Sequence, residues 1–518
     1  MTGPDSDLLG DWLDHAVRHD PARLLIIDGA LRISAAQLVA EARRMASALL
    51  AQAPVGSRIA FMLPNWHEAA IIYLGATLAG MVVLPILPGL RDRDLAFALS
   101  DSGARFIFAP ENFRGAEQAR MLGRVTAGME NPPHVVVVRG NPGPHTAFTA
   151  FLAASTPAAA IPQVSPDAVR MMMYTSGTTG RPKGVLHSHR TLAALIRQIG
   201  AHWMVDPGDC FLVPSPVSHI GGAIYAFECP LMLGSTALLM ERWDPDAAVA
   251  LAAAEGWTHM AGATPFLEGL LAAAARAGSS LDSMKLFICG GAAVPPALIR
   301  AAQRQFPHAT ITRVYGSTET PVATVGAIGP DKAEQAATTD GRPGIAAIRI
   351  APHPAAPPGE GEIRVHGPQM LVGYHHPQDM ADALDEQGWF CTGDLGHLTP
   401  DGFLVVTGRA KDIIIRHGEN ISAREVEDLL LAHPCVAQVA VVGIPDARTG
   451  ERAVAVVVPR PGAAPTLEQL VAFLDGQGLA RFKLPEGLHL TDTLPRNDAG
   501  KVLKAQLRAD LTGAAPNS

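Results

Sequence analysis

Short apolar segments alternate with alanine- and leucine-rich segments along most of the chain, and this order restricts the fold more than any other feature. The segment RIAFML (Arg58–Leu63) precedes NWHEAAIIYLGATLAG, ARFIFAP precedes ENFRGAEQARML, and MKLFICGG precedes PPALIRAAQRQF. Strands that alternate with helices in this way form parallel sheets, which the helices cover. A chain of 518 residues is also too long for one hydrophobic core. The sequence therefore predicts an α/β fold of layered, mainly parallel sheets in at least two domains.

The region from about Thr324 to Val406 has a different pattern. Its strands IAAIRIAP, GEIRVHG and GFLVVTG are separated by glycine- and proline-rich turns, which predicts a β-rich subdomain. After GRAKD (Gly408–Asp412) the pattern is that of a small α+β unit, where Ser422 and Glu425 have the spacing of a capping box. We expect a large N-terminal domain over 1–408, a hinge over 409–412 and a small C-terminal domain over 413–518.

One uncharged segment, Ala69–Leu90, is about long enough to span a bilayer. Gly75, Gly80, Pro85 and Pro88 interrupt it, which disfavours a single membrane helix. We interpret it as a buried helix ending near Leu78, a turn at Gly80 and a buried strand over Met81–Ile86. The sequence therefore predicts no integral membrane segment.

Charge and cysteine content limit the partners and the compartment. The net charge is −8, whereas proteins that bind nucleic acid usually present a basic surface. The N-terminal segment is acidic and lacks the basic start and apolar run of a signal peptide. The five cysteines include no C-x-x-C pair that would indicate a disulfide framework or a zinc site. We expect a cytoplasmic protein with no nucleic-acid partner.

The stretch YTSGTTGRPKG (Tyr174–Gly184) is rich in the residues that bind phosphate, but it does not match G-x-x-x-x-G-K-[ST]. Apolar strand-like segments, VRMMMYT and GVLHSH, lie on both sides of it, so we predict a glycine-rich hairpin. Its hydroxyl and backbone N–H groups suit phosphate oxygens, and Lys183 adds positive charge. An exposed polar turn is the alternative, although it does not account for the complete ordered string.

This stretch resembles the signature loop of the adenylate-forming superfamily, which includes acyl- and aryl-CoA synthetases, peptide-synthetase adenylation domains and luciferases. Further motifs of that family follow in the expected order, namely CGGAAVP, YGSTE, WFCTGDLG, GRAKD and PRNDAGK. The resemblance spans nearly the whole chain. It implies that the loop residues Thr175, Ser176, Gly177, Thr178, Thr179, Gly180 and Lys183 bind the phosphates of ATP.

The resemblance also implies roles for the motifs that follow. YGSTE would place the Tyr315 ring on adenine, the Thr318 hydroxyl on the α-phosphate and the Glu319 carboxylate on Mg²⁺, with Thr175 as a second metal contact. Asp394 and Arg409 would bind the ribose. Gly316, Ser317, Gly291, Ala292 and Ala293 would line the adenine and acyl pockets.

The end of the chain carries the residue with the largest implied role. Lys501 in PRNDAGK corresponds to the family's adenylation lysine, whose charge offsets the repulsion between a carboxylate and a phosphate. Lys411 occupies the hinge position, about which the small domain would rotate and exchange Lys501 for GENI. Asp498 departs from the family pattern and adds a negative charge beside this lysine.

The resemblance implies an AMP-forming acid–CoA ligase that uses ATP, Mg²⁺ and coenzyme A. Gly418 in GENI would flank the pantetheine arm, although His417 departs from the glycine common before it. His219 would lie at the acyl carboxylate and thiol. Two alternatives remain open: an acyl–AMP ligase that loads a separate carrier protein, and a noncatalytic nucleotide-binding protein.

The acid itself is less constrained. HIGGAIYAF contains no carboxylate before Glu228 to bind a substrate ammonium, which disfavours amino acids. The small residues Gly221, Gly222, Ala223 and Ala226 suggest a roomy apolar pocket. LPNWHEA, PILPGLRDRDLAF and PENFRG resemble cyclohexanecarboxylate and medium-chain acyl-CoA ligases, so we expect an alicyclic or medium-chain acid. Whether the chain forms a homo-oligomer stays open.

Two histidine pairs, His187 with His189 and His375 with His376, are also candidate metal ligands. Each pair would need a third ligand and supporting hydrogen bonds. We therefore favour a structural role for both pairs. Cys391 lies beside the proposed ribose motif, but no feature of the sequence indicates an activated thiolate.

Overall fold

The computed structural model describes residues 3–154, 161–175, 181–291, 294–329, 331–416, 419–446, 448–496 and 502–513. Its first large sheet has seven strands, parallel except for the β1–β2 hairpin. Their order is β16 (Thr310–Arg313), β15 (Leu286–Cys289), β14 (His259–Gly262), β12 (Cys210–Val213), β13 (Thr236–Leu239), β1 (Leu24–Asp28) and β2 (Leu31–Ser34).

The second large sheet has eight strands and an antiparallel edge, where β11 pairs with both of its neighbours. Their order is β19 (Gly373–Tyr374), β11 (Lys183–Ser188), β10 (Val169–Thr175), β4 (Val82–Pro85), β3 (Arg58–Phe61), β5 (Phe106–Ala109), β8 (His134–Val137) and β9 (Thr146–Ala147). The parallel strands have continuous apolar sequences because helices cover both faces of the sheet.

Helices between and outside these sheets make five layers, because each sheet buries both of its faces. The central layer, whose apolar side chains pack on both sheets, contains α1 (Leu9–His19), α2 (Ala35–Leu50), α3 (His67–Leu78), α6 (Phe148–Ala153), α7 (His189–His202) and α9 (Cys229–Met232). The seven-stranded sheet carries α10 (Pro245–Glu255), α11 (Thr264–Ala277) and α12 (Pro296–Gln305) on its other face. The eight-stranded sheet carries α4 (Asp92–Ser102) and α5 (Gln118–Ala127).

A four-stranded antiparallel sheet follows, as expected for the β-rich region. Its order is β17 (Ala347–Ala351), β18 (Gly361–His366), β20 (Phe390–Leu398) and β21 (Leu404–Arg409). Shorter elements complete this part of the chain: β6 (Asn112–Phe113), β7 (Ala116–Glu117), α8 (Ile220–Ala223), the π-helix η1 (Ile224–Glu228), α13 (Ala333–Thr338) and the 3₁₀ helix η2 (Pro377–Met380).

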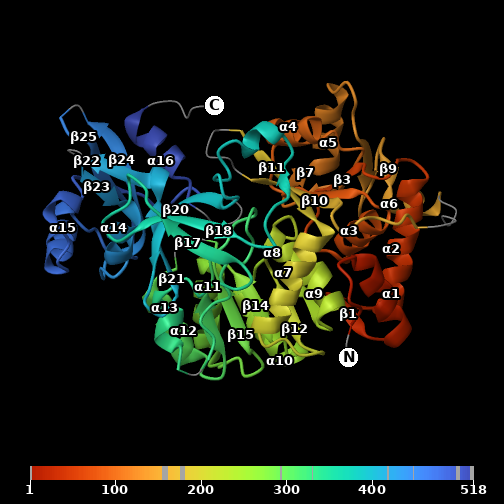
Figure 1. The fold of residues 1–518 in the computed structure, drawn as a ribbon, viewed down its shortest axis with the longest axis horizontal. Coiled ribbons are helices and arrows are strands. Elements are labelled where there is room, and N and C mark those ends of the chain that lie inside the picture. The colour runs from red at the N-terminus through yellow and green to blue at the C-terminus, as the bar shows by residue number, and fades with distance from the viewer. Residues whose placement is uncertain are drawn as a thin grey trace.

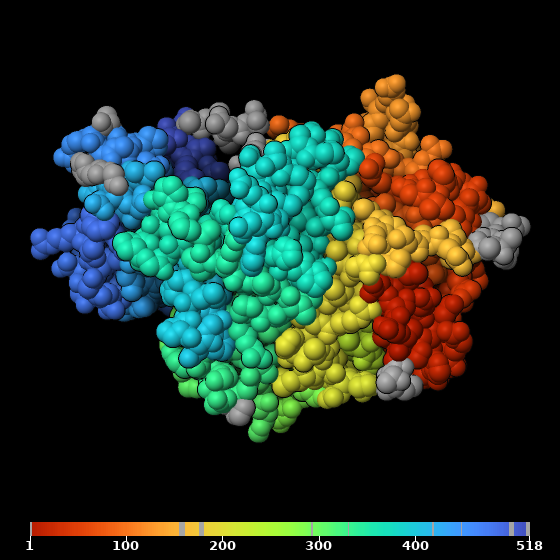
Figure 2. All heavy atoms as spheres, viewed as in Figure 1, coloured from red at the N-terminus to blue at the C-terminus, as the bar shows by residue number. Residues whose placement is uncertain are grey.

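The C-terminal region has its own sheet and cores, and it lies at one end of the long axis in Figure 1. It contains η3 (Ala410–Asp412), β22 (Ile413–Arg416), β23 (Glu419–Ser422), α14 (Ala423–Leu430), β24 (Val436–Asp446), β25 (Gly450–Pro459), α15 (Leu467–Gly476), η4 (Arg481–Lys483), β26 (Gly487–Leu490) and α16 (Lys504–Thr512). In Figure 2 this region (blue) forms a lobe against the β-rich region, while the N-terminal helices (red) lie at the opposite end. The α/β expectation, with a large N-terminal and a smaller C-terminal part, is confirmed.

The uncharged segment folds as expected. The helix α3 ends at Leu78, Gly80 takes φ of +66° in the turn, and β4 follows at Val82. Glycine adopts this left-handed conformation without the steric cost that a side chain brings. None of the helices within the described ranges combines the length and the apolar character needed to cross a bilayer.

Two local expectations were wrong. The stretch expected to continue as a helix after ARFIFAP first forms the β6–β7 hairpin, and α5 begins only at Gln118. At α14, the Ser422 hydroxyl accepts from the Glu425 N–H at 3.3 Å, but the reciprocal half of the capping box is absent. The Glu425 carboxylate instead binds the ammonium of Lys483 at 2.7 Å, because a tertiary cation offers a charge-assisted partner.

Candidate active site

One short segment, Tyr315–Glu319, follows β16 and contributes to two neighbouring polar groups. Its turn depends on Gly316, where an added Cβ would lie 2.6 Å from the Val322 nitrogen and 2.9 Å from the Thr320 oxygen. No side chain fits at such distances from backbone atoms, so glycine is required here for packing. The segment therefore holds Tyr315 and Glu319 in a fixed relation to each other.

The first group joins Tyr315 to the two residues expected to bind ribose. Asp394 and Arg409 face each other on the paired strands β20 and β21, and Arg409 Nε lies 2.9 Å from Asp394 Oδ1. The Tyr315 hydroxyl donates to Asp394 Oδ2 at 2.8 Å. Burial, and then the neighbouring Asp394 carboxylate, raise the pKa of Tyr315 well above its ordinary value. The structure thus brings together three residues that are far apart in the sequence.

The second group joins Glu319 to the strand that begins at Lys183. Tyr374, on the edge strand β19, donates its hydroxyl to Glu319 Oε1 at 3.1 Å. Lys183 Nζ lies 5.1 Å from the centre of the Tyr374 ring, which is within the range of a cation–π contact. The aromatic ring therefore connects a carboxylate and a cation. Sequence reasoning missed Tyr374, because no motif marks the strand that carries it.

The strands on either side of the glycine-rich stretch pair as a hairpin, as expected. β10 and β11 run antiparallel, and Thr175, the last residue of β10, lies opposite Lys183, the first residue of β11. Of the expected nucleotide-binding residues, the hairpin residues Ser176, Gly177, Thr178, Thr179 and Gly180 lie outside the described residues, as do Ala292, Ala293, Gly418 and Lys501.

Thr318 is held through its backbone by a buried histidine. His187 Nε2 donates to the Thr318 carbonyl oxygen at 2.7 Å, and His187 Nδ1 lies 3.2 Å from the Thr191 hydroxyl. Burial lowers the pKa of His187 to about 4, and burial lowers that of His189 to about 3. Both imidazoles are buried and neutral, so the structural role favoured for this pair agrees with their contacts.

We expect the chain to lose stability as the pH falls from 6.5 to about 4. The unfolded chain protonates His187 near pH 6.5, whereas the folded chain does so only near pH 4. Stability from the neutral imidazole is complete above pH 6.5 and is lost across this interval, by on the order of 3 kcal/mol. Denaturant titrations at several pH values should show a shallower pH slope for His187→Gln, which keeps a donor for Thr318. The exposed control His489→Gln should keep the original slope, and equal slopes for both variants would contradict the assignment.

His219 lies at the start of α8, in a loop that a buried asparagine fixes. Asn65, 3% exposed, donates to the carbonyl oxygens of Val213 and Ser215 at 2.9 Å and accepts from the Val217 N–H at 2.9 Å. Such a satisfied buried amide gives the loop one defined conformation. The polar residue within the apolar stretch LPNWHEA was the available signal for this role. These contacts of the loop do not connect His219 to Glu319, Tyr374 or Lys183.

The small residues after His219 do not open a pocket in the way expected. An added Cβ on Gly222 would lie 2.1 Å from the Pro216 oxygen, so this glycine permits close packing of two backbone segments. Ala223 and Ala226 are completely buried in the central core. Gly221 alone of the four is partly exposed. The expectation of a roomy pocket built from all four residues was therefore wrong, because Gly222 lies against the Pro216 backbone and both alanines are buried in the core.

A fully buried ion pair anchors the far end of this region. Arg170 on β10 binds Glu228 at 2.7 Å, with side-chain exposures of 2% and 0%, and the Tyr73 hydroxyl donates to Glu228 at 2.5 Å. The pair ties the π-helix η1 to β10, the first strand of the β10–β11 hairpin. A single arginine in the otherwise apolar strand VRMMMYT was the sequence signal, because a buried charge requires a partner.

The proposed hinge lies between two sheets that contact each other. Ser422 donates to the Thr407 oxygen at 2.7 Å, and Arg508 lies 3.4 Å from Asp412. Partial burial, and then the nearby Arg409 guanidinium, lower the pKa of Lys411. The chain passes from β21 to β22 through η3, which contains Lys411.

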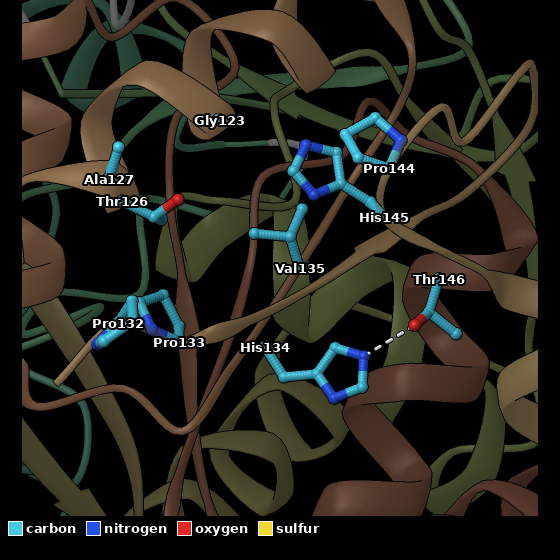
Figure 3. A pocket seen from close by; sticks show the side chains of 10 residues that line it. All are labelled: Gly123, Thr126, Ala127, Pro132, Pro133, His134, Val135, Pro144, His145 and Thr146. Carbon is cyan, nitrogen blue, oxygen red and sulfur yellow. Dashed lines mark hydrogen bonds between the residues drawn. The ribbon is translucent and has the colours of Figure 1, made fainter.

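Other polar features of the N-terminal region lie apart from these groups. Figure 3 shows a hollow that is lined by two imidazoles, and a dashed line marks the contact of His134 with the Thr146 hydroxyl at 2.7 Å. The other imidazole, that of His145, lies 3.1 Å from the Ala119 oxygen. A second cluster, Asp28, His67 and Glu68, has the ligand types of a metal site. The Arg139 guanidinium lies within 3.0 Å of both carboxylates and takes the place of a cation there.

Known protein families, relatives and solved structures match this chain over nearly its whole length. The AMP-binding enzyme model matches residues 13–375, and the AMP-binding enzyme C-terminal domain model matches residues 425–501. The medium-chain fatty-acid–CoA ligase of Escherichia coli (strain K12) is 34% identical over 97% of this chain and 90% of its own. Indoleacetate–CoA ligase of Aromatoleum aromaticum is 33% identical over 96% of this chain and 97% of its own. The crystal structure of ATP-bound MatB from Rhodopseudomonas palustris superimposes with a TM-score of 0.84 and 29% identity, over 97% of this chain and 98% of that one.

Proposed function

The chain belongs to the AMP-binding enzyme family and is an AMP-forming acid–CoA ligase, and we propose that its acid is apolar, with a medium-length chain or an alicyclic ring. The enzyme uses ATP, Mg²⁺ and coenzyme A. In the first half-reaction, a carboxylate oxygen attacks the α-phosphorus of ATP and pyrophosphate leaves. In the second, the CoA thiol loses its proton and attacks the acyl carbon, and AMP leaves.

The position of the segment Tyr315–Glu319 is the observation that supports this site best. At one end Tyr315 contacts the Asp394–Arg409 pair, and at the other Glu319 contacts Tyr374 beside Lys183. One short stretch thus connects a place suited to ribose and base with a place suited to phosphates. A nucleotide lying along it would present its α-phosphate near Thr318.

We assign the nucleoside to the first group. The Asp394 carboxylate accepts hydrogen bonds from ribose hydroxyls, while Arg409 and Tyr315 hold that carboxylate in place through the contacts at 2.9 Å and 2.8 Å. The Tyr315 ring provides a flat apolar surface for adenine. Gly291 has φ of +80°, and among the residues that the structure describes no atom lies within 4 Å of an added Cβ at this position, just after β15.

We assign the phosphates to the second group. Lys183 supplies the positive charge that stabilises departing pyrophosphate. Glu319 and Thr175 offer carboxylate and hydroxyl oxygens, the ligand type that Mg²⁺ prefers. These two residues would hold the ion, which when bound neutralises phosphate charge. Lys501 would supply the charge that brings the carboxylate and the α-phosphate together.

The charge around the His219 loop supports an apolar acid. Glu228, the first carboxylate after His219, is fully committed to Arg170 and Tyr73. It therefore offers no free charge to a substrate ammonium. Medium-chain fatty acids and indoleacetate, named for two relatives, are likewise acids with an apolar body.

We place the reaction in the cytoplasm. All five cysteines are free, which fits a reducing compartment where ATP and coenzyme A are available. We also propose that rotation at 409–412 exchanges Lys501 for the segment around Gly418 between the half-reactions.

A panel of short, medium-chain, alicyclic and aromatic acids tests the proposal. We expect acid-dependent pyrophosphate release to be highest with the medium-chain or alicyclic members, and to be followed by formation of the CoA thioester. A preference for short dicarboxylic or amino acids would overturn the assignment of an apolar acid. Acyl transfer to a carrier protein but not to CoA would favour the alternative of a carrier-loading ligase.

Replacing Glu319 by glutamine is expected to lower pyrophosphate release by at least about tenfold and to raise the Mg²⁺ concentration needed for half-maximal rate. The amide keeps the size of the side chain but loses the charge that attracts the ion. Initial rates over a Mg²⁺ titration measure both effects. The same change at Glu386, which is exposed, is the matched control. An unchanged Mg²⁺ requirement in Glu319→Gln would remove this residue from the metal site.

A further inference from the structure

Asp101, near the end of α4, joins both arms of the β10–β11 hairpin, which is called the phosphate hairpin because of its proposed role. Its side chain is 11% exposed, and Oδ2 accepts a hydrogen bond from the Tyr174 hydroxyl at 2.6 Å. Its other oxygen, Oδ1, accepts from His376 Nε2 at 2.7 Å and lies 3.8 Å from Arg181. Tyr174 is the last residue but one of β10, and Arg181 lies two residues before β11 begins at Lys183. The helix α4 is therefore linked to the hairpin on both sides of its turn.

Further contacts strengthen the link on each arm. Phe97 lies one helical turn before Asp101 and meets the Tyr174 ring edge-on at 5.8 Å between centroids. On the other arm, Arg181 also binds both oxygens of Asp379, at 2.8 and 2.9 Å. The hairpin ends are thus held by both packing and charge.

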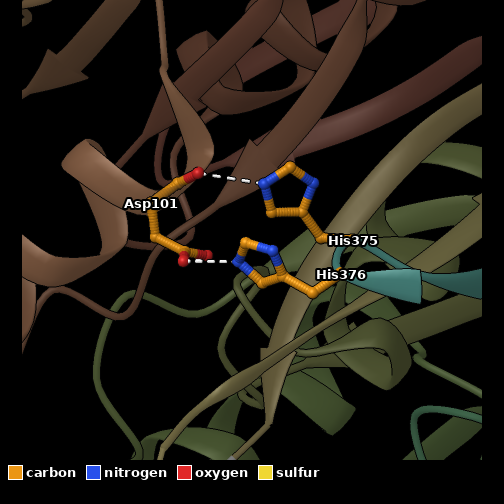
Figure 4. Close-up of side chains that lie close together, drawn as sticks. All are labelled: Asp101, His375 and His376. Atoms are coloured by element: carbon orange, nitrogen blue, oxygen red, sulfur yellow. Dashed lines mark hydrogen bonds and ion pairs between the residues drawn. The ribbon is translucent and has the colours of Figure 1, made fainter. Parts of the chain in front are cut away.

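Asp101 also holds the segment that carries Tyr374, through the two histidines that follow this tyrosine. His375 Nε2 donates to the backbone oxygen of Asp101 at 2.9 Å, and His376 binds the carboxylate. Figure 4 shows the His375 imidazole directed at the backbone oxygen of Asp101 and the His376 imidazole directed at its carboxylate. Tyr374 precedes them and contacts both Glu319 and Lys183. Asp101 therefore links the hairpin to the proposed metal carboxylate through one set of hydrogen bonds.

Asp101, His375 and His376 also have the ligand types of a metal site. Two guanidinium groups stand beside them, however. Arg58 lies 3.2 Å from His375 Nδ1, and Arg181 lies 3.8 Å from Asp101 Oδ1. A divalent cation placed here would be repelled by both at short range. The arrangement fits a hydrogen-bonded anchor rather than a metal centre.

We propose that Asp101 is a positioning residue that fixes the phosphate hairpin relative to Glu319 for binding of ATP. This inference rests on the proposed roles of the hairpin and of Glu319 in adenylation. Hydrogen bonds to an ionised acceptor are about twice as strong as neutral ones, so the charge of Asp101 matters to the anchor. Burial by itself would raise the pKa of Asp101, but the bonds from Tyr174 and His376 outweigh it and hold the pKa below its ordinary value. The carboxylate is therefore ionised wherever the enzyme works near neutral pH.

The two half-reactions distinguish positioning from general destabilisation. The hairpin holds the pyrophosphate part of ATP, which is absent when acyl-AMP is supplied directly. A loosened hairpin should therefore impair adenylation and leave thioester formation from acyl-AMP and CoA intact. Loss of folded protein would instead lower both reactions in parallel.

For Asp101→Asn we expect the KM for MgATP to rise about tenfold, with kcat changed less and the KM for the acid unchanged. The rate of thioester formation from supplied acyl-AMP should stay within about twofold. Asp92→Asn is the matched control, because this aspartate lies on the same helix in an exposed pair with Arg124. Tyr174→Phe should raise the KM for MgATP in the same direction, and the double variant should show less than the product of the two effects.

Calorimetric titration with MgATP keeps this test independent of the acid chosen. Weaker MgATP binding by Asp101→Asn than by the parent enzyme would support the anchor even if every acid tried were a poor substrate. Unchanged MgATP affinity, or equal losses in both half-reactions, would overturn the proposal. If the parent enzyme binds MgATP but releases no pyrophosphate with any of the apolar acids, the result would instead count against the proposed substrate class.

Discussion

Lys501→Ala is expected to lower acid-dependent pyrophosphate release by about 100- to 1,000-fold while leaving thioester formation from supplied acyl-AMP nearly unchanged. The lysine would bring together two anions, the carboxylate and the α-phosphate, and alanine offers no charge to offset their repulsion. Its role is over once the acyl-AMP bond exists. Pre-steady-state measurement of pyrophosphate release, followed by a separate assay from acyl-AMP and CoA, checks both halves of this expectation.

Lys483→Ala is the control for the loss of a lysine in the same C-terminal region. This lysine is bound to Glu425 near the surface, and such pairs contribute about 0 to 1 kcal/mol. We expect both of its half-reactions to stay close to those of the parent enzyme. Full adenylation by Lys501→Ala would exclude this residue from the mechanism. Parallel loss of both half-reactions would contradict a role confined to adenylation.

The second large effect is on stability. Replacing Arg170 by methionine is expected to destabilise the chain by about 3 to 5 kcal/mol, because it leaves the Glu228 carboxylate without its cation in the core. Neither side chain of the pair has access to water, with exposures of 2% and 0%. Chemical denaturation followed by fluorescence gives the shift in midpoint, and the slope converts it to a free energy.

Removing both charges is expected to be less harmful than removing one. Arg170→Met combined with Glu228→Leu should recover most of the lost stability, since no unpaired charge then remains. Arg276→Met is the control, because its pair with Asp246 is 59% and 70% exposed and should cost less than about 1 kcal/mol. A double variant no more stable than Arg170→Met would show that packing, and not charge, sets the cost.

The local order of elements could be predicted from the sequence because periodicity and turn residues act over short distances. The helix and strand on either side of Gly80, and the β10–β11 hairpin, have the positions that their apolar runs and glycines indicate. The cap at α14 could be predicted only in part. Ser422 caps the helix, but Glu425 is taken by Lys483, 58 residues further along the chain.

The motifs also indicated which side chains would share a site. Tyr315, Asp394 and Arg409 are joined by hydrogen bonds in the structure, and Glu319 lies on the same segment as Tyr315. The small residues after His219 gave the wrong signal. A glycine that lines a pocket and a glycine that lets two backbones touch have the same letter, and the Pro216 oxygen decides the case of Gly222.

The sequence by itself determined the α/β layering, the family of the chain and the grouping of Tyr315, Asp394 and Arg409, because these depend on local patterns and on ordered motifs. The tertiary structure alone decided which distant side chains support them. Arg170 and Glu228, and Asp101 with Tyr174 and His376, are 58 to 275 residues apart. Such partners have no common spacing in the chain. Only the packing of the sheets and helices brings their charges within hydrogen-bond distance, and Asp101 thereby contacts both arms of the β10–β11 hairpin.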